Sequence, residues 1–195
     1  MSIKVSSAKI IHSEITRIFV GEFYEGLFLH IFGGEKLEEE GKEDHLPDVI
    51  EREERRLYEV KSSSKYNYYH LRDCQMDDLN FLLTRGEFRG FELFFAFFTY
   101  TLSRISKTYE DREELHQALA DGTESLLILP YDLVRRVHEE GKSRYDGNKY
   151  DNLTKLRRTD IRELLEGLEL RTDTSGQIQF DGYTVKPFEV IEVEQ

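Results

Sequence analysis

The stretch FELFFAFFTYTL, residues 91–102, is the longest apolar run in the chain and constrains its fold most strongly. The run is too short to cross a membrane as a helix, and Glu92 and several hydroxyl side chains interrupt it. Its aromatic and threonine side chains favour extended structure. The run therefore predicts a buried strand.

Helical and extended patterns alternate around this strand. Helices are expected over residues 7–32, 71–84, 131–140 and 154–170, with a weaker one over 108–120. Further strands are expected over residues 46–51, 56–63 and 125–130, and Asp181-Gly182 indicates a hairpin in the tail. This order predicts an α/β fold with a central sheet flanked by helices, in a single domain over residues 1–195. We expect the core over residues 7–140 and a helix and β-hairpin extension over residues 150–195.

The helix expected over residues 7–32 contains two unusual charges. Its second half, FVGEFYEGLFLHIF, is hydrophobic on nearly every side, and Glu22 and Glu25 are its only charged residues. A helix of this kind is usually buried, and a buried carboxylate needs a partner. Both glutamates are therefore candidate functional residues.

The composition excludes several classes of function. The 39 Asp and Glu residues exceed the 27 Lys and Arg residues and give a formal net charge of −12, whereas a general nucleic-acid coat protein is usually basic. A nucleic-acid enzyme needs only a local patch of basic residues, so the acidic net charge is compatible with this class. Cys74 is the single cysteine, which excludes a disulfide framework within one chain. The chain also has no apolar leader or membrane-spanning run, so we expect a cytoplasmic protein without membrane segments.

The segment PDVIEREERRLYEVK, residues 47–61, combines acids and a lysine within two strand-like runs. Glu59 and Lys61 project from the same face of a strand, and a hairpin would bring Asp48 close to Glu59. Two close carboxylates repel unless a cation lies between them, and Mg²⁺ combines a few carboxylates with water and phosphate oxygens. A nearby lysine can orient the attacking water or stabilise charge at phosphorus. Asp48, Glu59 and Lys61 are therefore candidate residues for metal-assisted phosphodiester hydrolysis.

The spacing of PD, ten residues and EVK resembles the signature of the PD-(D/E)xK nuclease superfamily. That group includes many restriction endonucleases and the archaeal Holliday junction resolvases. The resemblance covers roughly residues 14–103 and implies a restriction-endonuclease-like sheet. In such a sheet Asp48, Glu59 and Lys61 would form the active site.

The resemblance also implies residues outside the signature. Members often add a glutamate from the preceding helix, and the pattern Gly21-x-x-x-Glu25 favours Glu25 over Glu22 as a catalytic and metal-binding residue. Gln75 matches a glutamine that members often carry on the helix after the signature. We expect a few further polar and basic residues to contact substrate. These are Ser63, Lys65 and Arg72.

These features predict a Mg²⁺-dependent DNA endonuclease, or the nuclease subunit of a larger DNA-processing system, with Mn²⁺ as a substitute metal. Asp48, Glu59 and Glu25 would bind the metal, and DNA would be the partner. We expect a homodimer, since cutting both strands takes two sites. DNA or RNA, and duplex, junction or single strand, stay open as substrates.

Other interpretations stay open too. Asp48, Glu59 and Lys61 would form ordinary surface pairs in a solvent-facing hairpin. A catalytically inactive module of the same fold would bind nucleic acid or a partner protein, and a plain interaction domain would hold the acids apart. The basic residues of 142–150 and 155–162 and the tyrosines of SKYNYYH, residues 64–70, either bind phosphates and bases or form ordinary surface.

Overall fold

The computed structural model describes residues 3–37, 45–102, 109, 111–144, 153–156 and 158–193. Its helices are α1 (Ile3–Phe32), α2 (Asp73–Thr84), α3 (Arg112–Gly122), α4 (Tyr131–Arg144) and α5 (Arg158–Leu165). Its strands are β1 (Glu35–Lys36), β2 (Val49–Glu51), β3 (Arg56–Ser64), β4 (Tyr69–Arg72), β5 (Glu92–Tyr100), β6 (Thr123–Pro130), β7 (Leu153–Leu156), β8 (Leu170–Thr174), β9 (Ile178–Phe180), β10 (Tyr183–Val185) and β11 (Glu189–Val193).

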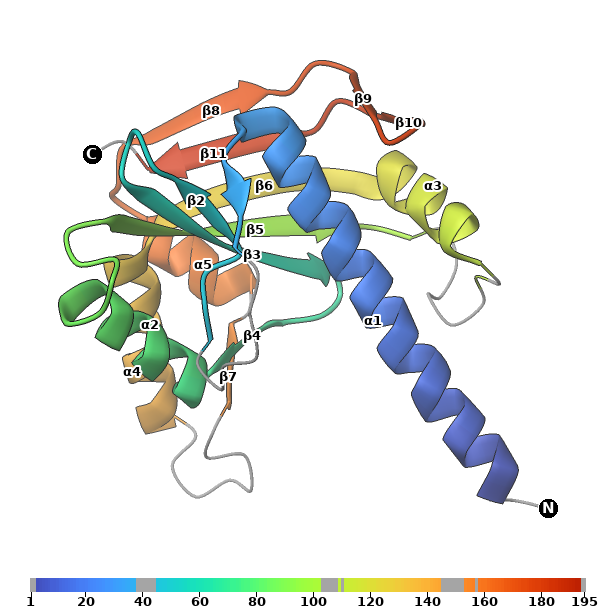
Figure 1. Ribbon diagram of the computed structural model, residues 1–195, viewed down its shortest axis with the longest axis horizontal. Coiled ribbons are helices and arrows are strands. Elements are labelled where there is room, and N and C mark those ends of the chain that lie inside the picture. The colour runs from blue at the N-terminus through green and yellow to red at the C-terminus, as the bar shows by residue number, and fades with distance from the viewer. Residues whose placement is uncertain are drawn as a thin grey trace.

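A seven-stranded sheet in the order β1-β2-β3-β5-β6-β11-β8 forms the centre of the molecule (Figure 1). Strand β3 runs parallel to β5 and β11 runs parallel to β6, whereas the other neighbours are antiparallel. Helices cover both faces of this mixed sheet. The predicted α/β class is therefore confirmed, whereas the arrangement specific to restriction endonucleases stays a prediction.

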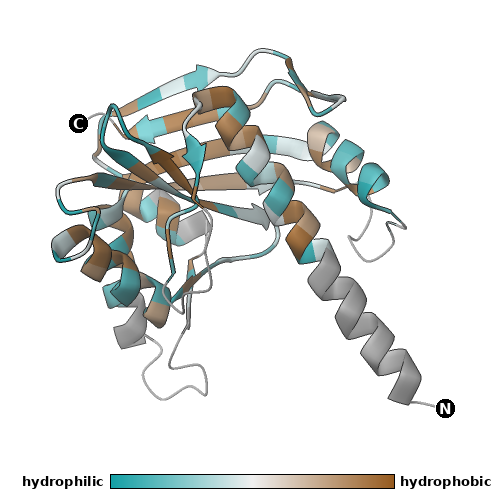
Figure 2. Cartoon of the chain, viewed as in Figure 1, coloured by the Kyte–Doolittle hydropathy of each residue, from teal (hydrophilic) through white to brown (hydrophobic). Residues whose placement is uncertain are grey.

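Strand β5 is the buried strand that the run FELFFAFFTYTL predicts. Phe95, Ala96, Phe97 and Phe98 are each at most 1% exposed. Alternate side chains point to opposite faces of the sheet, so this one strand contributes to two cores. Figure 2 shows the hydrophobic residues concentrated along the middle strands, with hydrophilic residues on β8 and α3.

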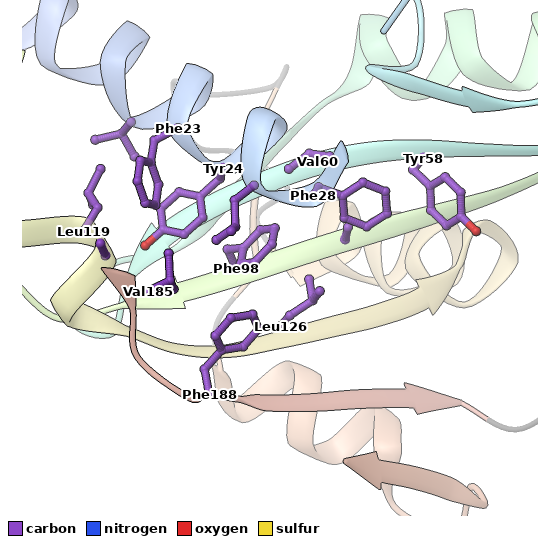
Figure 3. Close-up of a cluster of buried hydrophobic side chains, with 14 of the residues drawn as sticks. Phe23, Tyr24, Phe28, Tyr58, Val60, Phe98, Leu119, Leu126, Val185 and Phe188 are labelled. Atoms are coloured by element: carbon purple, nitrogen blue, oxygen red, sulfur yellow. The ribbon is translucent and has the colours of Figure 1, made fainter. Parts of the chain in front are cut away.

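The first core lies between the sheet and helices α1 and α3 and is rich in aromatic side chains (Figure 3). Tyr24 of α1 stacks on Phe98 of β5 with ring centroids 4.7 Å apart. The second core lies on the opposite face, where Phe95 and Phe97 pack with Leu79 of α2 and Val134 of α4. The sheet is thus a layer between two sets of helices.

Several predicted boundaries are wrong, and one short strand pair is the main reason. Residues 69–72 form β4, so the helix expected over 71–84 begins at Asp73. Strand β4 pairs antiparallel with β7, which occupies the start of the helix expected over 154–170. Tyr69 and Leu71 are buried whereas His70 and Arg72 are exposed, which is the alternation of a strand. Helix α1 also begins at Ile3, earlier than expected.

The C-terminal residues return to the central sheet. The hairpin expected at Asp181-Gly182 is confirmed, with Phe180 opposite Tyr183 and positive φ angles of 47° and 82° at the two turn residues. Strand β11 then pairs with β6, and β8 forms the edge of the sheet beside it. Residues 145–150 of the basic stretch 142–150 lie outside the described residues. No helix in the described part of the chain is long and apolar enough to cross a membrane.

Candidate active site

The β2–β3 hairpin brings Asp48 opposite Glu59. Val49 pairs with Tyr58 in this hairpin, so Asp48, the residue just before β2, lies across from Glu59. Asp48 Oδ2 accepts a hydrogen bond of 2.6 Å from the backbone N–H of Val60. This bond holds the Asp48 carboxylate against strand β3, as the sequence predicts for a hairpin.

Glu59 is almost completely buried, at 2% exposure. Its Oε1 accepts a hydrogen bond of 2.6 Å from Gln75 Nε2 of helix α2 and another from Lys61 Nζ. Its Oε2 is buried and has no hydrogen-bond partner among the described residues. An unpaired buried carboxylate oxygen is costly, so this atom is suited to accept a cation.

Asp48 lies in an environment that opposes its ionisation. Burial raises its pKa well above the ordinary value of 3.8, and the negative charges of Glu59 and Glu25 raise it further. Lys61 acts in the opposite direction. Burial lowers the pKa of Lys61, but Glu59 and Asp48 outweigh that effect and raise its pKa overall, so its ammonium stays protonated. Ionisation of Asp48 would therefore give the site more negative charge than Lys61 alone offsets.

The structure separates the two glutamates of helix α1. Glu25 Oε2 lies 2.7 Å from Lys36 Nζ of strand β1, and its charge acts on Asp48. Glu22 instead pairs with Arg112 of α3 at 3.3 Å. Glu25 is thus the helix acid beside the hairpin. Lys36 was not predictable as a partner of Glu25, because nothing in the acidic segment around it indicates an edge strand.

The predicted substrate residues take different positions. Gln75 is buried and donates to Glu59, so it orients that acid. Ser63 Oγ lies 3.2 Å from the backbone oxygens of Ser64 and Tyr68, to which it donates. Lys65 Nζ pairs with Glu124 at 3.1 Å.

A cleft of ≈720 Å³ opens beside Lys61 and Gln75. Its walls come mainly from α1, β3, β4 and the turn between those strands, with Gln75 of α2 and Tyr100 of β5 also lining it. Three fixed cations and two imidazoles line it, and none of its lining residues is Asp or Glu. The basic lining residues are Arg17, Lys61, Arg72, His45 and His70. Arg17 and His70 were missed by the sequence analysis, because their place in the cleft depends on how α1 crosses the sheet and on strand β4.

Comparisons with protein-family models, with curated proteins and with solved structures found no match for this chain. The assignment of the site therefore rests on its own geometry and on the resemblance of its motif.

The donor set fits Mg²⁺ better than a metal that needs a complete protein cage. Within the described ranges, no group of three His, Cys, Asp or Glu side chains is arranged to hold a metal ion. Mg²⁺ is commonly bound by one or two carboxylates, with water and substrate phosphate as the remaining ligands. Asp48 and the unpaired Oε2 of Glu59 offer that number.

Proposed function

We propose that this protein is a Mg²⁺-dependent nuclease that hydrolyses phosphodiester bonds in DNA. The observation that carries the proposal is the buried Glu59, which has one oxygen bound by Lys61 and Gln75 and the other without a partner. A fold that only needed stability would have no use for this arrangement, because a buried carboxylate costs free energy. The location of a cationic cleft beside it supports the same function.

The residues divide into distinct roles. Asp48 and Glu59 would hold Mg²⁺, which when bound supplies an electrophile for a phosphate oxygen and acidifies water. Gln75 fixes the orientation of Glu59 through its 2.6 Å hydrogen bond. Lys61 stays protonated and lies at the wall of the cleft, where its ammonium can stabilise charge that develops at phosphorus.

Glu25 would complete the site from helix α1. Its carboxylate is exposed enough to reach solvent and is now paired with Lys36. To reach a metal-bound water, the Glu25 side chain would leave Lys36. This movement would cost little, because ion pairs at the surface contribute little to stability. Mn²⁺ would substitute for Mg²⁺, since both prefer oxygen ligands.

A catalytically inactive module that binds nucleic acid is the second candidate. The pairing of Glu25 with Lys36 favours it, because that ion pair engages the acid that would complete a metal site. Such a module would keep the cleft but would not need Lys61 for any reaction.

Cleavage assays distinguish the two candidates. Plasmid, linear duplex, single-stranded and branched DNA would be incubated in Mg²⁺ and in Mn²⁺ with the wild type, Lys61→Met and Asp48→Asn. We expect metal-dependent cutting that falls by about 10²–10³-fold in both variants, the scale seen when one group that stabilises transition-state charge is removed.

Lys186→Met is the matched control, because Lys186 is exposed and pairs with Asp121 on another part of the surface. It should cut as the wild type does. Equal cutting by all variants would indicate a contaminating nuclease, and no cutting by the wild type on any substrate would favour the inactive module.

A further inference from the structure

The paired strands β4 and β7 form a ribbon with one basic face. Tyr69, Leu71, Thr154 and Leu156 point inward and are buried. The alternate residues point outward, so His70 pairs across the ribbon with Lys155, and Arg72 lies two residues along from His70. We call His70, Arg72 and Lys155 the cationic ribbon. It joins two basic segments that lie far apart in the sequence.

Positive charges converge at this ribbon and at Arg17 beside it. Partial burial of its ring lowers the pKa of His70, and the charges of Lys155, Arg17 and Arg72 lower it further. Among the described residues, neither Arg17 nor Arg72 has an acidic partner within ion-pair distance. Because such repulsion is unfavourable, an anion is the ligand that this side of the cleft fits.

Exposed Tyr68 lines the same cleft, and exposed Tyr66 lies two residues before it in the chain. Tyr66 is 80% exposed and Tyr68 is 43% exposed, both in the turn between β3 and β4. Lys65 Nζ lies 5.4 Å from the ring centre of Tyr66, and Lys155 Nζ lies 5.8 Å from that of Tyr68. A cationic groove with exposed aromatic rings is typical of proteins that bind unpaired nucleic acid strands.

We propose that this cleft binds a single unpaired strand of nucleic acid, with its phosphates along Arg17 and the cationic ribbon and a base stacked on Tyr68. The inference rests on the proposed function, since it names the substrate class of that same site. The strand would continue from the ribbon past Lys61 to Glu59, which places its phosphodiester beside the carboxylates.

Three properties of the molecule favour a single strand over a duplex. A cleft of ≈720 Å³ falls in the range of about 300–1,000 Å³ that is usual for enclosed small ligands. It therefore accommodates a short length of one strand. A tyrosine can stack only on a base whose face is free, and the net charge of −12 repels a polyanion outside the cleft.

Binding is measured by fluorescence anisotropy in EDTA, so that hydrolysis does not contribute. The probes are labelled oligothymidylate, labelled oligouridylate and a hairpin duplex, each titrated at several salt concentrations. We expect a single strand to bind at least about tenfold more tightly than the duplex. The logarithm of the binding constant falls linearly with the logarithm of the salt concentration, and each phosphate contact with a single strand contributes about 0.7 to that slope. Loss of Arg72 and Lys155 together should therefore reduce the steepness of the slope by about 1.4. Comparison of oligothymidylate with oligouridylate shows whether the cleft binds DNA or RNA more tightly.

The matched control for charge is Arg171→Ala, because Arg171 is exposed on the edge strand β8 and pairs with Asp173. Arg72→Ala should weaken binding about tenfold, whereas the control should not. Tyr68→Ala should weaken binding about tenfold and Tyr68→Phe should preserve it, because stacking needs the ring and not the hydroxyl.

The outcomes separate this inference from the proposed function. Tighter binding of the duplex, or equal effects of Arg72→Ala and Arg171→Ala, would overturn the inference even if the protein cuts DNA. Single-strand binding that depends on Arg72 and Tyr68 would support it even if no cleavage occurs. Circular dichroism of each variant establishes that it is folded.

Discussion

Strand β3 presents Tyr58 and Val60 to helix α1 and presents Glu59 and Lys61 to the opposite side, where Gln75 of helix α2 lies. The two faces are buried to a similar degree, since Val60 is 9% exposed and Glu59 is 2% exposed. Their chemistry differs completely. One face belongs to an aromatic core, and the other holds a carboxylate that is only partly satisfied.

This difference separates what stabilises the protein from what we propose it uses for catalysis. Burial of apolar side chains against α1 contributes about 1.5–3 kcal/mol for each large residue. Burial of Glu59 and Asp48 costs free energy, which neighbouring hydrogen bonds offset only in part. Local rules of stability are commonly broken at functional sites. We therefore expect that removing a buried side chain on the α1 face lowers the free energy of unfolding, whereas neutralising a buried acid on the other side raises it.

The largest expected effect is on the α1 face. Phe98 is fully buried, stacks on Tyr24 at 4.7 Å and meets Phe188 edge-on at 6.2 Å. Phe98→Ala should lower the free energy of unfolding by about 3–5 kcal/mol, because it removes apolar contacts and leaves a cavity. Urea denaturation measures the loss. Phe81→Ala is the control, since Phe81 is 56% exposed and should change stability little. Similar losses in both variants would contradict the assignment of the core.

The strongly patterned elements were predictable from the sequence. The run at residues 91–102 indicated a buried strand because its apolar content admits little else, and the Asp181-Gly182 turn indicated its own hairpin. The β4–β7 ribbon was not predictable, because its strands have only four residues each and pair across about 80 positions of the chain. A pattern so short is compatible with the first turn of a helix, and both strands overlap the starts of the helices expected over 71–84 and 154–170.

The candidate site divides in the same way. Asp48, Glu59 and Lys61 were predictable because a hairpin fixes their relation within a few residues. The position of Gln75 was also expected, but its role as a donor to Glu59 depends on how α2 packs. Arg17, Lys36 and Lys155 were not identified as neighbours of this site, because each comes from a separate element. Tertiary packing alone brings them together.

The second prediction concerns Glu59 and Asp48, whose buried carboxylates a bound Mg²⁺ would stabilise. If Mg²⁺ binds Glu59 and Asp48 only in the folded protein, a concentration about 100 times its Kd adds about 2.7 kcal/mol to the free energy of unfolding. Thermal denaturation with and without Mg²⁺ should show this gain in the wild type. Glu59→Gln should abolish it, because the amide keeps the shape of the side chain without its charge.

Glu92→Gln is the control for this measurement. Glu92 is exposed at the start of β5 and lies 3.9 Å from Arg56. Its loss should leave the response to Mg²⁺ unchanged. An identical Mg²⁺ response in Glu59→Gln and the wild type would show that Glu59 is not a metal ligand.

The smallest expected effect concerns the protonation of Asp48 in the absence of metal. Burial and the charges of Glu59 and Glu25 raise its pKa in the folded state above the unfolded value. Protonation of Asp48 therefore favours folding. Its stabilising contribution is complete below the unfolded pKa, about 4, and is lost as the pH rises through the folded pKa.

Asp48→Asn removes this titration and retains an oxygen that can accept from the Val60 N–H. The variant should match the wild type near pH 4 and exceed it by about 1 kcal/mol at pH 7, or about 2–4 °C in Tm. Urea denaturation in EDTA across this range measures the difference. Asp173→Asn, on the exposed strand β8, should show no such divergence. A variant less stable than the wild type at pH 7 would mean that the Asp48 carboxylate stabilises the hairpin. The contrast between the two faces of β3 would then be confined to Glu59.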